Sequence, residues 1–228
     1  CEYDANGPLN MTQCSATCLA PNGCGGASTK LPAAQCAAWV KFYDGTNGDG
    51  WTRDAASCTR YDPCACNGCG GKPPVCNSAN TAVTTVDLRN SNLNGTLPEE
   101  IGDWGDLTWF EVDNNKIRGV VPASTTKWTK LTEFKVAWNH LSPAALPPLD
   151  FAQMTHCGLL NHQDGGSNAF HCPWPQGATA KCLKSNGPDW IPITDSDCVG
   201  RLRCNAATGA CEYDANGPLN MTQCSATC

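Results

Sequence analysis

The sequence predicts a short solenoid of parallel strands, closed at both ends by disulfide-rich caps and followed by a small cysteine-rich module. Two observations lead to this fold class. Apolar residues recur with a period of 24 between residues 83 and 154, and 18 cysteines are spread over the 228 residues. A fixed period is the signature of a repeat architecture, and dense cysteines indicate an oxidising compartment. We therefore expect an α/β-type solenoid with short parallel strands and a mostly irregular back face.

The three repeats begin at Val83, Leu107 and Leu131. Within each repeat, apolar residues two apart indicate a short strand with alternate side chains pointing inward. A later apolar residue and a proline then turn the chain back along the opposite face. The aligned apolar positions after the first are Val86, Phe110 and Phe134, then Leu88, Val112 and Val136, then Leu93, Ile117 and Leu141.

These repeats resemble the plant-type leucine-rich repeat, whose pattern is LxxLxLxxNxLxGxIP. The segments GTLP at residues 95–98 and GVVP at residues 119–122 match it closely. The resemblance covers residues 83 to about 175, and it implies that Asn115 and Asn139 bind the backbone of neighbouring coils. Ser91 stands at this position in the first repeat, which implies weaker hydrogen bonding between coils there. The third repeat departs from the pattern at residues 142–147, so its back face is not predicted.

Segments on either side of the repeats resemble the caps of secreted members of this family. A short solenoid needs such caps because its end coils would otherwise expose apolar faces to water. Residues 36–52 are similar to the helix and loop that precede the repeats, and residues 154–182 are similar to a closing half-repeat. The expected organisation is residues 1–28 as half of a linker module, 29–82 as the N-terminal cap, 83–153 as repeats, 154–189 as the C-terminal cap and 190–228 as a complete linker module.

The cysteines are expected to form disulfides in a secreted, extracellular protein. Two metal sites are weighed as alternatives: thiolate ligation of zinc within residues 64–76, and calcium binding by Asp44, Asn47 and Asp49. The cysteine spacing is short enough for zinc, but disulfides are the simpler expectation in an oxidising compartment and no His lies near. The calcium residues miss the alternate-position spacing of an EF-hand loop, and a glycine-rich turn explains them as well. The disulfide candidates are Cys1, Cys14, Cys18, Cys24, Cys36, Cys58, Cys64, Cys66, Cys69, Cys76, Cys157, Cys172, Cys182, Cys198, Cys204, Cys211, Cys224 and Cys228.

Charge and short motifs narrow the partners further. A net charge of -6 without a basic cluster argues against nucleic acid. No apolar run approaches the length of a membrane span, so no membrane segment is expected in this stretch. N-glycosylation is expected at Asn10, Asn94 and Asn220, which head Asn-x-Ser/Thr triplets. No other cofactor is expected.

The outward strand positions form the candidate binding face. A tryptophan among charged residues could stack on a sugar ring or anchor a protein partner. No nucleophile elbow or carboxylate pair accompanies the four histidines, His140, His156, His162 and His171, so they are interpreted as surface or packing residues and an enzyme is not expected. The residues of this face are Thr85, Asp87, Arg89, Trp109, Glu111, Asp113, Glu133 and Lys135.

The first eighteen residues, CEYDANGPLNMTQCSATC, recur unchanged at residues 211–228. The recurrence predicts tandem or head-to-tail units of about 210 residues, because the first copy lacks the cysteines that precede the second. Head-to-tail contacts that do not close into a ring extend into filaments. The leading hypothesis is therefore a glycosylated extracellular fibre whose partners are copies of itself along the fibre axis. The alternative is a secreted module that binds a glycan or protein through the sheet face.

Overall fold

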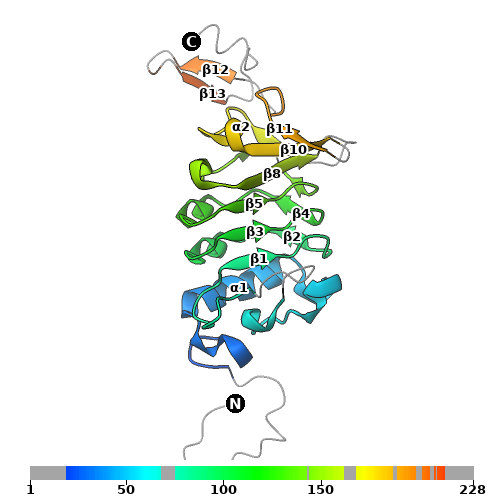
Figure 1. Cartoon of the computed structure of the whole chain (residues 1–228), viewed down its shortest axis with the longest axis vertical. Helices are drawn as coiled ribbons and strands as arrows, with labels where there is room; N and C mark the ends of the chain where they lie inside the picture. Colours follow the sequence, from blue (N-terminus) through cyan, green and yellow to red (C-terminus); the bar gives the residue numbers. More distant parts are fainter. Residues whose placement is uncertain are drawn as a thin grey trace, which may run out of the picture.

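The computed structural model describes residues 19–67, 75–142, 144–161, 168–186, 189–198, 202–205, 208 and 210–213. The coils stack along the long axis of the molecule, and each adds one short strand to the same sheet (Figure 1). The strands of this main sheet are parallel apart from the last, which pairs antiparallel. In spatial order they are β1 (Thr85–Asp87), β3 (Trp109–Glu111), β5 (Glu133–Lys135), β8 (His156–Asn161), β10 (Cys182–Asn186) and β11 (Asp189–Pro192).

The register of the main sheet confirms the predicted repeat. Val86 pairs with Phe110, Phe110 with Phe134, and Phe134 with Cys157. All four side chains are buried. Equivalent residues of successive repeats therefore lie on top of one another in a continuous core, which is how a solenoid buries apolar faces that one coil cannot bury alone. The fold is a short, disulfide-rich leucine-rich-repeat solenoid.

The back of the stack is more regular than expected. It carries a second parallel sheet in the order β2 (Asn94–Thr96), β4 (Lys116–Gly119) and β6 (His140–Leu141). After the third repeat, β7 (Ala144–Ala145) pairs in parallel with β9 (Phe170–His171), so the chain leaves the second sheet where the repeat pattern fails. Short 3-10 helices turn each coil: η6 (Glu99–Asp103), η7 (Ala123–Lys127) and η8 (Phe151–Gln153).

The N-terminal cap covers the first coil with helix α1 (Ala33–Gly45), which begins after Pro32. Its inward side chains Trp39 and Phe42 pack on Trp104 of the first repeat, with ring centroids 6.4 and 5.5 Å away. The surrounding 3-10 helices are η1 (Gly26–Lys30), η2 (Gly48–Gly50), η3 (Arg53–Ser57) and η4 (Pro63–Ala65). Three disulfides fasten this cap: Cys24–Cys36, Cys58–Cys66 and Cys64–Cys76.

Residues beyond the predicted boundary at residue 190 are connected to the C-terminal cap. Strand β11 completes the main sheet, and the Cys172–Cys198 disulfide joins residues on either side of that boundary. We propose that the cap ends after Cys198, because both connections fix residues 190–198 to the solenoid. Helix α2 (Ala178–Lys181) and the Cys157–Cys182 disulfide complete this cap, and β12 (Leu202–Asn205) pairs with β13 (Ala210–Tyr213) beyond it.

The groups weighed as metal ligands have other partners. Cys64, Cys66 and Cys76 are in disulfides, so their thiolates are not available to zinc, and Cys69 lies outside the described residues. Asp44 pairs with Arg60, and Asp49 accepts a hydrogen bond from the Tyr43 hydroxyl. In the described part of the chain, no three His, Cys, Asp or Glu side chains come together in a way that could hold a metal ion. No helix in that part has the length and apolar character needed to cross a bilayer.

Candidate binding site on the sheet face

The predicted face carries two layers of charge rather than freely exposed residues. The carboxylates of Asp87, Glu111 and Glu133 are nearly fully buried, whereas Arg89 and Lys135 lie further out and are partly exposed. Arg89 pairs with Glu111 at 3.0 Å and with Asp87 at 3.1 Å. Lys135 pairs with Glu111 at 3.2 Å and with Glu133 at 3.7 Å. These carboxylates of the predicted face are therefore buried, with the longer cationic side chains paired to them on the outside.

Trp109, the aromatic residue predicted to anchor a ligand, already contacts other side chains of the face. Its indole N–H donates to Glu111 at 2.9 Å, and the Lys135 ammonium lies 5.6 Å from the ring centroid, a cation–π distance. A ligand that stacked on the face of the Trp109 ring that Lys135 covers would have to displace the Lys135 ammonium group. Thr85, the neighbour of Trp109 in the sheet register, is buried. Trp109 is therefore part of the charged network, and Lys135 covers one face of its ring.

Asp113 differs from the other carboxylates of the face. Its Oδ1 atom is buried and has no hydrogen-bond partner among the residues that the structure describes. The pKa of Asp113 is raised to about 7, first by burial and then by the nearby Glu111 carboxylate, while Arg89 and Lys135 oppose the rise. A carboxyl oxygen that is buried without a hydrogen bond makes the group costly to ionise. Asp113 is thus a carboxyl group that a ligand cation could stabilise in its charged form.

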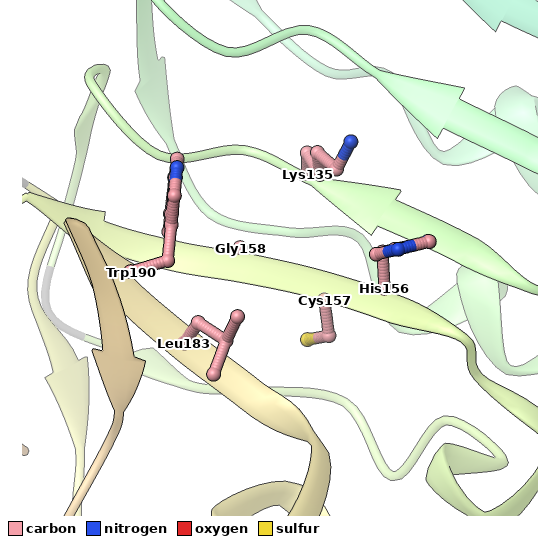
Figure 2. Close-up of a pocket in the computed structure, with 6 residues that line it drawn as sticks. All are labelled: Lys135, His156, Cys157, Gly158, Leu183 and Trp190. Carbon is pink, nitrogen blue, oxygen red and sulfur yellow. The ribbon is translucent and has the colours of Figure 1, made fainter. Parts of the chain in front are cut away.

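A pocket of about 180 Å³ opens beside this network, at the C-terminal end of the main sheet. Lys135 and His156 form one side and Trp190 the other, as Figure 2 shows. Cys157, Gly158 and Leu183 complete the lining, so most of the surface is carbon and sulfur. His156 also bonds to Glu133, which links the pocket wall to the buried carboxylates.

The pocket depends on the absence of a side chain at residue 158. A Cβ atom there would lie 3.1 Å from the Trp190 ring and 3.5 Å from Cγ of Lys135. The Trp190 ring reaches from β11 across β8 above this glycine (Figure 2), and 43% of its surface is exposed. Exposed tryptophans in hollows are typical anchors of binding surfaces.

Trp190 and His156 were not predicted as members of this site. Trp190 lies outside the 24-residue period and belongs to the antiparallel strand β11, so no repeat position predicts its direction. His156 occupies the sheet position beside Glu133, and alignment of the half-repeat with the third repeat could have found it. Among the other histidines, His140 is exposed on β6, His171 lies on β9, and His162 is outside the described residues.

Of the three predicted glycosylation sites, only Asn94 lies in the described part of the chain. It begins β2, and its Oδ1 accepts a hydrogen bond from Arg118 at 2.6 Å. Strand β2 belongs to the second sheet, so a glycan at Asn94 would not originate on the pocket face. Asn10 and Asn220 are outside the described residues, as are Cys1, Cys14, Cys18, Cys69, Cys224 and Cys228.

Comparison with known proteins gives structural neighbours only. No family model matches the chain, and no curated protein matches it. The crystal structure of PEPR1-AtPEP1 is similar over 66% of this chain and 24% of that chain, at 17% identity and a TM-score of 0.44. The LRR ectodomain of the receptor kinase SOBIR1 from Arabidopsis thaliana matches 68% of this chain and 93% of that chain, at 13% identity and a TM-score of 0.39. The crystal structure of a pollen receptor kinase 3 matches 55% of this chain and 82% of that chain, at 16% identity and a TM-score of 0.28.

Proposed function

We propose that this protein is an extracellular leucine-rich-repeat module that binds a partner through its sheet face. The observation that carries the proposal is the pocket between Trp190 and Lys135, which combines an exposed aromatic wall with a largely apolar lining. Ligand sites are typically concave and mostly apolar, with few polar groups at the edge. The disulfides of both caps support a secreted location.

The charged network next to the pocket favours a preorganised surface. Arg89 and Lys135 are each held by two carboxylates, so their side chains lose less rotamer freedom when a partner binds. Removal of either cation would take an ion-pair partner from two nearly buried carboxylates, which is unfavourable. The face can therefore bind without first ordering its own side chains.

A pocket-filling substitution tests the proposed function. We expect Gly158→Val to reduce binding to a combined panel of immobilised glycans and synthetic peptides by at least about tenfold, because the valine takes the space beside Trp190. Gly105→Val is the matched control, since a Cβ atom at residue 105 meets nothing within 4 Å. Equal binding by the wild type and Gly158→Val, with the fold intact by circular dichroism, would exclude this pocket as the site.

The recurrence of residues 1–18 at 211–228 favours a second candidate, a fibre of tandem units. It rests on the sequence alone, because residues 1–18 and 214–228 are outside the described part of the chain. A fibre could also carry the binding face at regular intervals. We expect native material to keep a mass of several units after complete reduction. A fall to a single unit would mean that units are joined only by disulfides, and single units before reduction would exclude the fibre.

A further inference from the structure

The sheet face fits one class of partner. We propose that its ligand is an extended basic peptide, which places an apolar or aromatic side chain in the Trp190 pocket and a Lys or Arg side chain over Asp113. This inference rests on the proposed function and adds the chemistry of the partner to it. Three features carry it: the lining of the pocket, the charge of the adjacent network, and the distance between them.

The pocket lining selects an apolar group over a sugar. Gly158, Cys157 and Leu183 supply its base, and Trp190 supplies one wall. Sugar recognition needs several hydrogen-bonding side chains around the ring, whereas the surface of this pocket is almost entirely apolar. Trp109, the other tryptophan of the face, is engaged with Lys135 and Glu111. An apolar peptide side chain is therefore the better occupant.

The charges beside the pocket select a cation. Two permanent cations, Arg89 and Lys135, face the carboxyl groups of Asp87, Glu111, Asp113 and Glu133. Carboxyl groups thus outnumber these cations, and Asp113 keeps an oxygen without a hydrogen bond in the described part of the chain. A guanidinium or ammonium group from a ligand would supply both the missing charge and the missing donor. The net charge of -6 for the whole chain favours the same partner.

The spacing of the two features fits an extended chain. Asn114, which follows Asp113, donates its backbone N–H to Ala137, and Ala137 donates to Gly158, at 3.0 and 3.2 Å. Asp113 and Gly158 are therefore two strands apart, or roughly 10 Å. An extended peptide covers this distance in about three residues.

Capped synthetic peptides with one Trp and one Arg test the inference by calorimetric titration. The two residues are set about two, three or four positions apart in a glycine background. We expect the best spacing to bind, and replacement of its Arg by Glu, or of its Trp by Gly, to weaken binding by about tenfold each. Asp113→Asn should weaken the Arg peptide by a similar factor and leave a Gln peptide of the same length unaffected.

The outcomes separate this inference from the proposed function. If the Glu peptide binds as well as the Arg peptide, or if only glycans bind while Gly158→Val abolishes their binding, the pocket is a site and the basic-peptide inference is wrong. If no peptide binds at millimolar concentration, the inference is also wrong. If Gly158→Val changes nothing for any ligand, both proposals fail.

Binding of the Arg peptide should strengthen as the pH rises from 6 to 8. The pKa of Asp113 is raised to about 7, so its carboxyl group is mainly neutral at the lower pH and mainly charged at the higher one. Glu111 faces it as a like charge, Arg89 and Lys135 as opposite charges, and His156 lies in the pocket wall. The variant His156→Gln shows whether the pH response comes from the His156 imidazole or from Asp113. A pH response that persists in Asp113→Asn would contradict the role of this carboxyl group.

Discussion

Asn139→Ala is expected to lower the free energy of unfolding by about 3 kcal/mol, because it leaves several buried backbone groups without partners. The Asn139 side chain accepts from the Ile117 N–H at 2.9 Å and donates to the carbonyls of Val112 and Val136 at 2.9 and 3.0 Å. These bonds join two successive coils at a residue that is 1% exposed. Urea unfolding under non-reducing conditions measures the change.

Gln153→Ala is the matched control for the asparagine ladder. Its side-chain amide also donates to the backbone of the preceding coil, to the Thr129 carbonyl at 2.7 Å, but at an exposed position where water can replace it. We expect a loss below about 1 kcal/mol. Similar losses for both variants would show that the Asn139 bonds hold the coils together no better than a surface contact.

Trp104→Ala is expected to destabilise the protein by about 4 kcal/mol, the usual range for removal of a large aromatic from a core. Trp104 is fully buried between the first repeat and the N-terminal cap, and its indole N–H donates to the Gln35 carbonyl at 3.3 Å. The variant removes the surface on which Trp39 and Phe42 pack. The loss should therefore detach the cap as well as create a cavity.

Thermal unfolding followed by circular dichroism measures this loss, and Trp190→Ala provides the control. Both variants delete the same side chain, but Trp190 is 43% exposed and Trp104 is not exposed at all. We expect Trp190→Ala to change stability by less than about 1 kcal/mol. A large loss at Trp190 would indicate that its ring serves the fold rather than a ligand.

The repeats were predictable because one physical rule applies to every coil. Each coil must bury the same apolar positions, and the period in the sequence gives the sheet register directly. The implied roles of Asn115 and Asn139 also hold in the structure: Asn115 accepts from Ser91 and Leu93 and donates to Leu88.

The asparagine side chains that hydrogen-bond successive coils continue beyond the 24-residue repeats. Asn168 accepts from the Leu141 N–H at 3.0 Å and donates to the carbonyls of Val136 and Leu159. It stands 29 residues after Asn139 rather than 24, so alignment of the repeats does not find it. The hydrogen bonds between coils require a side-chain amide at one position in space. A longer connection between Asn139 and Asn168 still places the Asn168 amide there.

The geometry of the candidate binding face was predicted only in part. Strand alternation places Asp87, Glu111 and Lys135 on one side of the sheet, as observed. Alternation says nothing of how long side chains fold over shorter ones, which is why the carboxylates are buried under Arg89 and Lys135. Strand alternation also does not predict the position of Trp190, because β11 pairs antiparallel with β10 and belongs to the cap rather than to a repeat.

The most direct test of the account is the affinity of Trp190→Ala for the best ligand of the wild-type protein, measured by calorimetric titration alongside Trp109→Ala. We predict that Trp190→Ala loses at least about tenfold in affinity with its stability unchanged. Trp109→Ala should disturb the charged network and weaken binding less, because its ring is covered by Lys135. Full affinity in Trp190→Ala would contradict the claim that the sheet face binds its partner through this pocket.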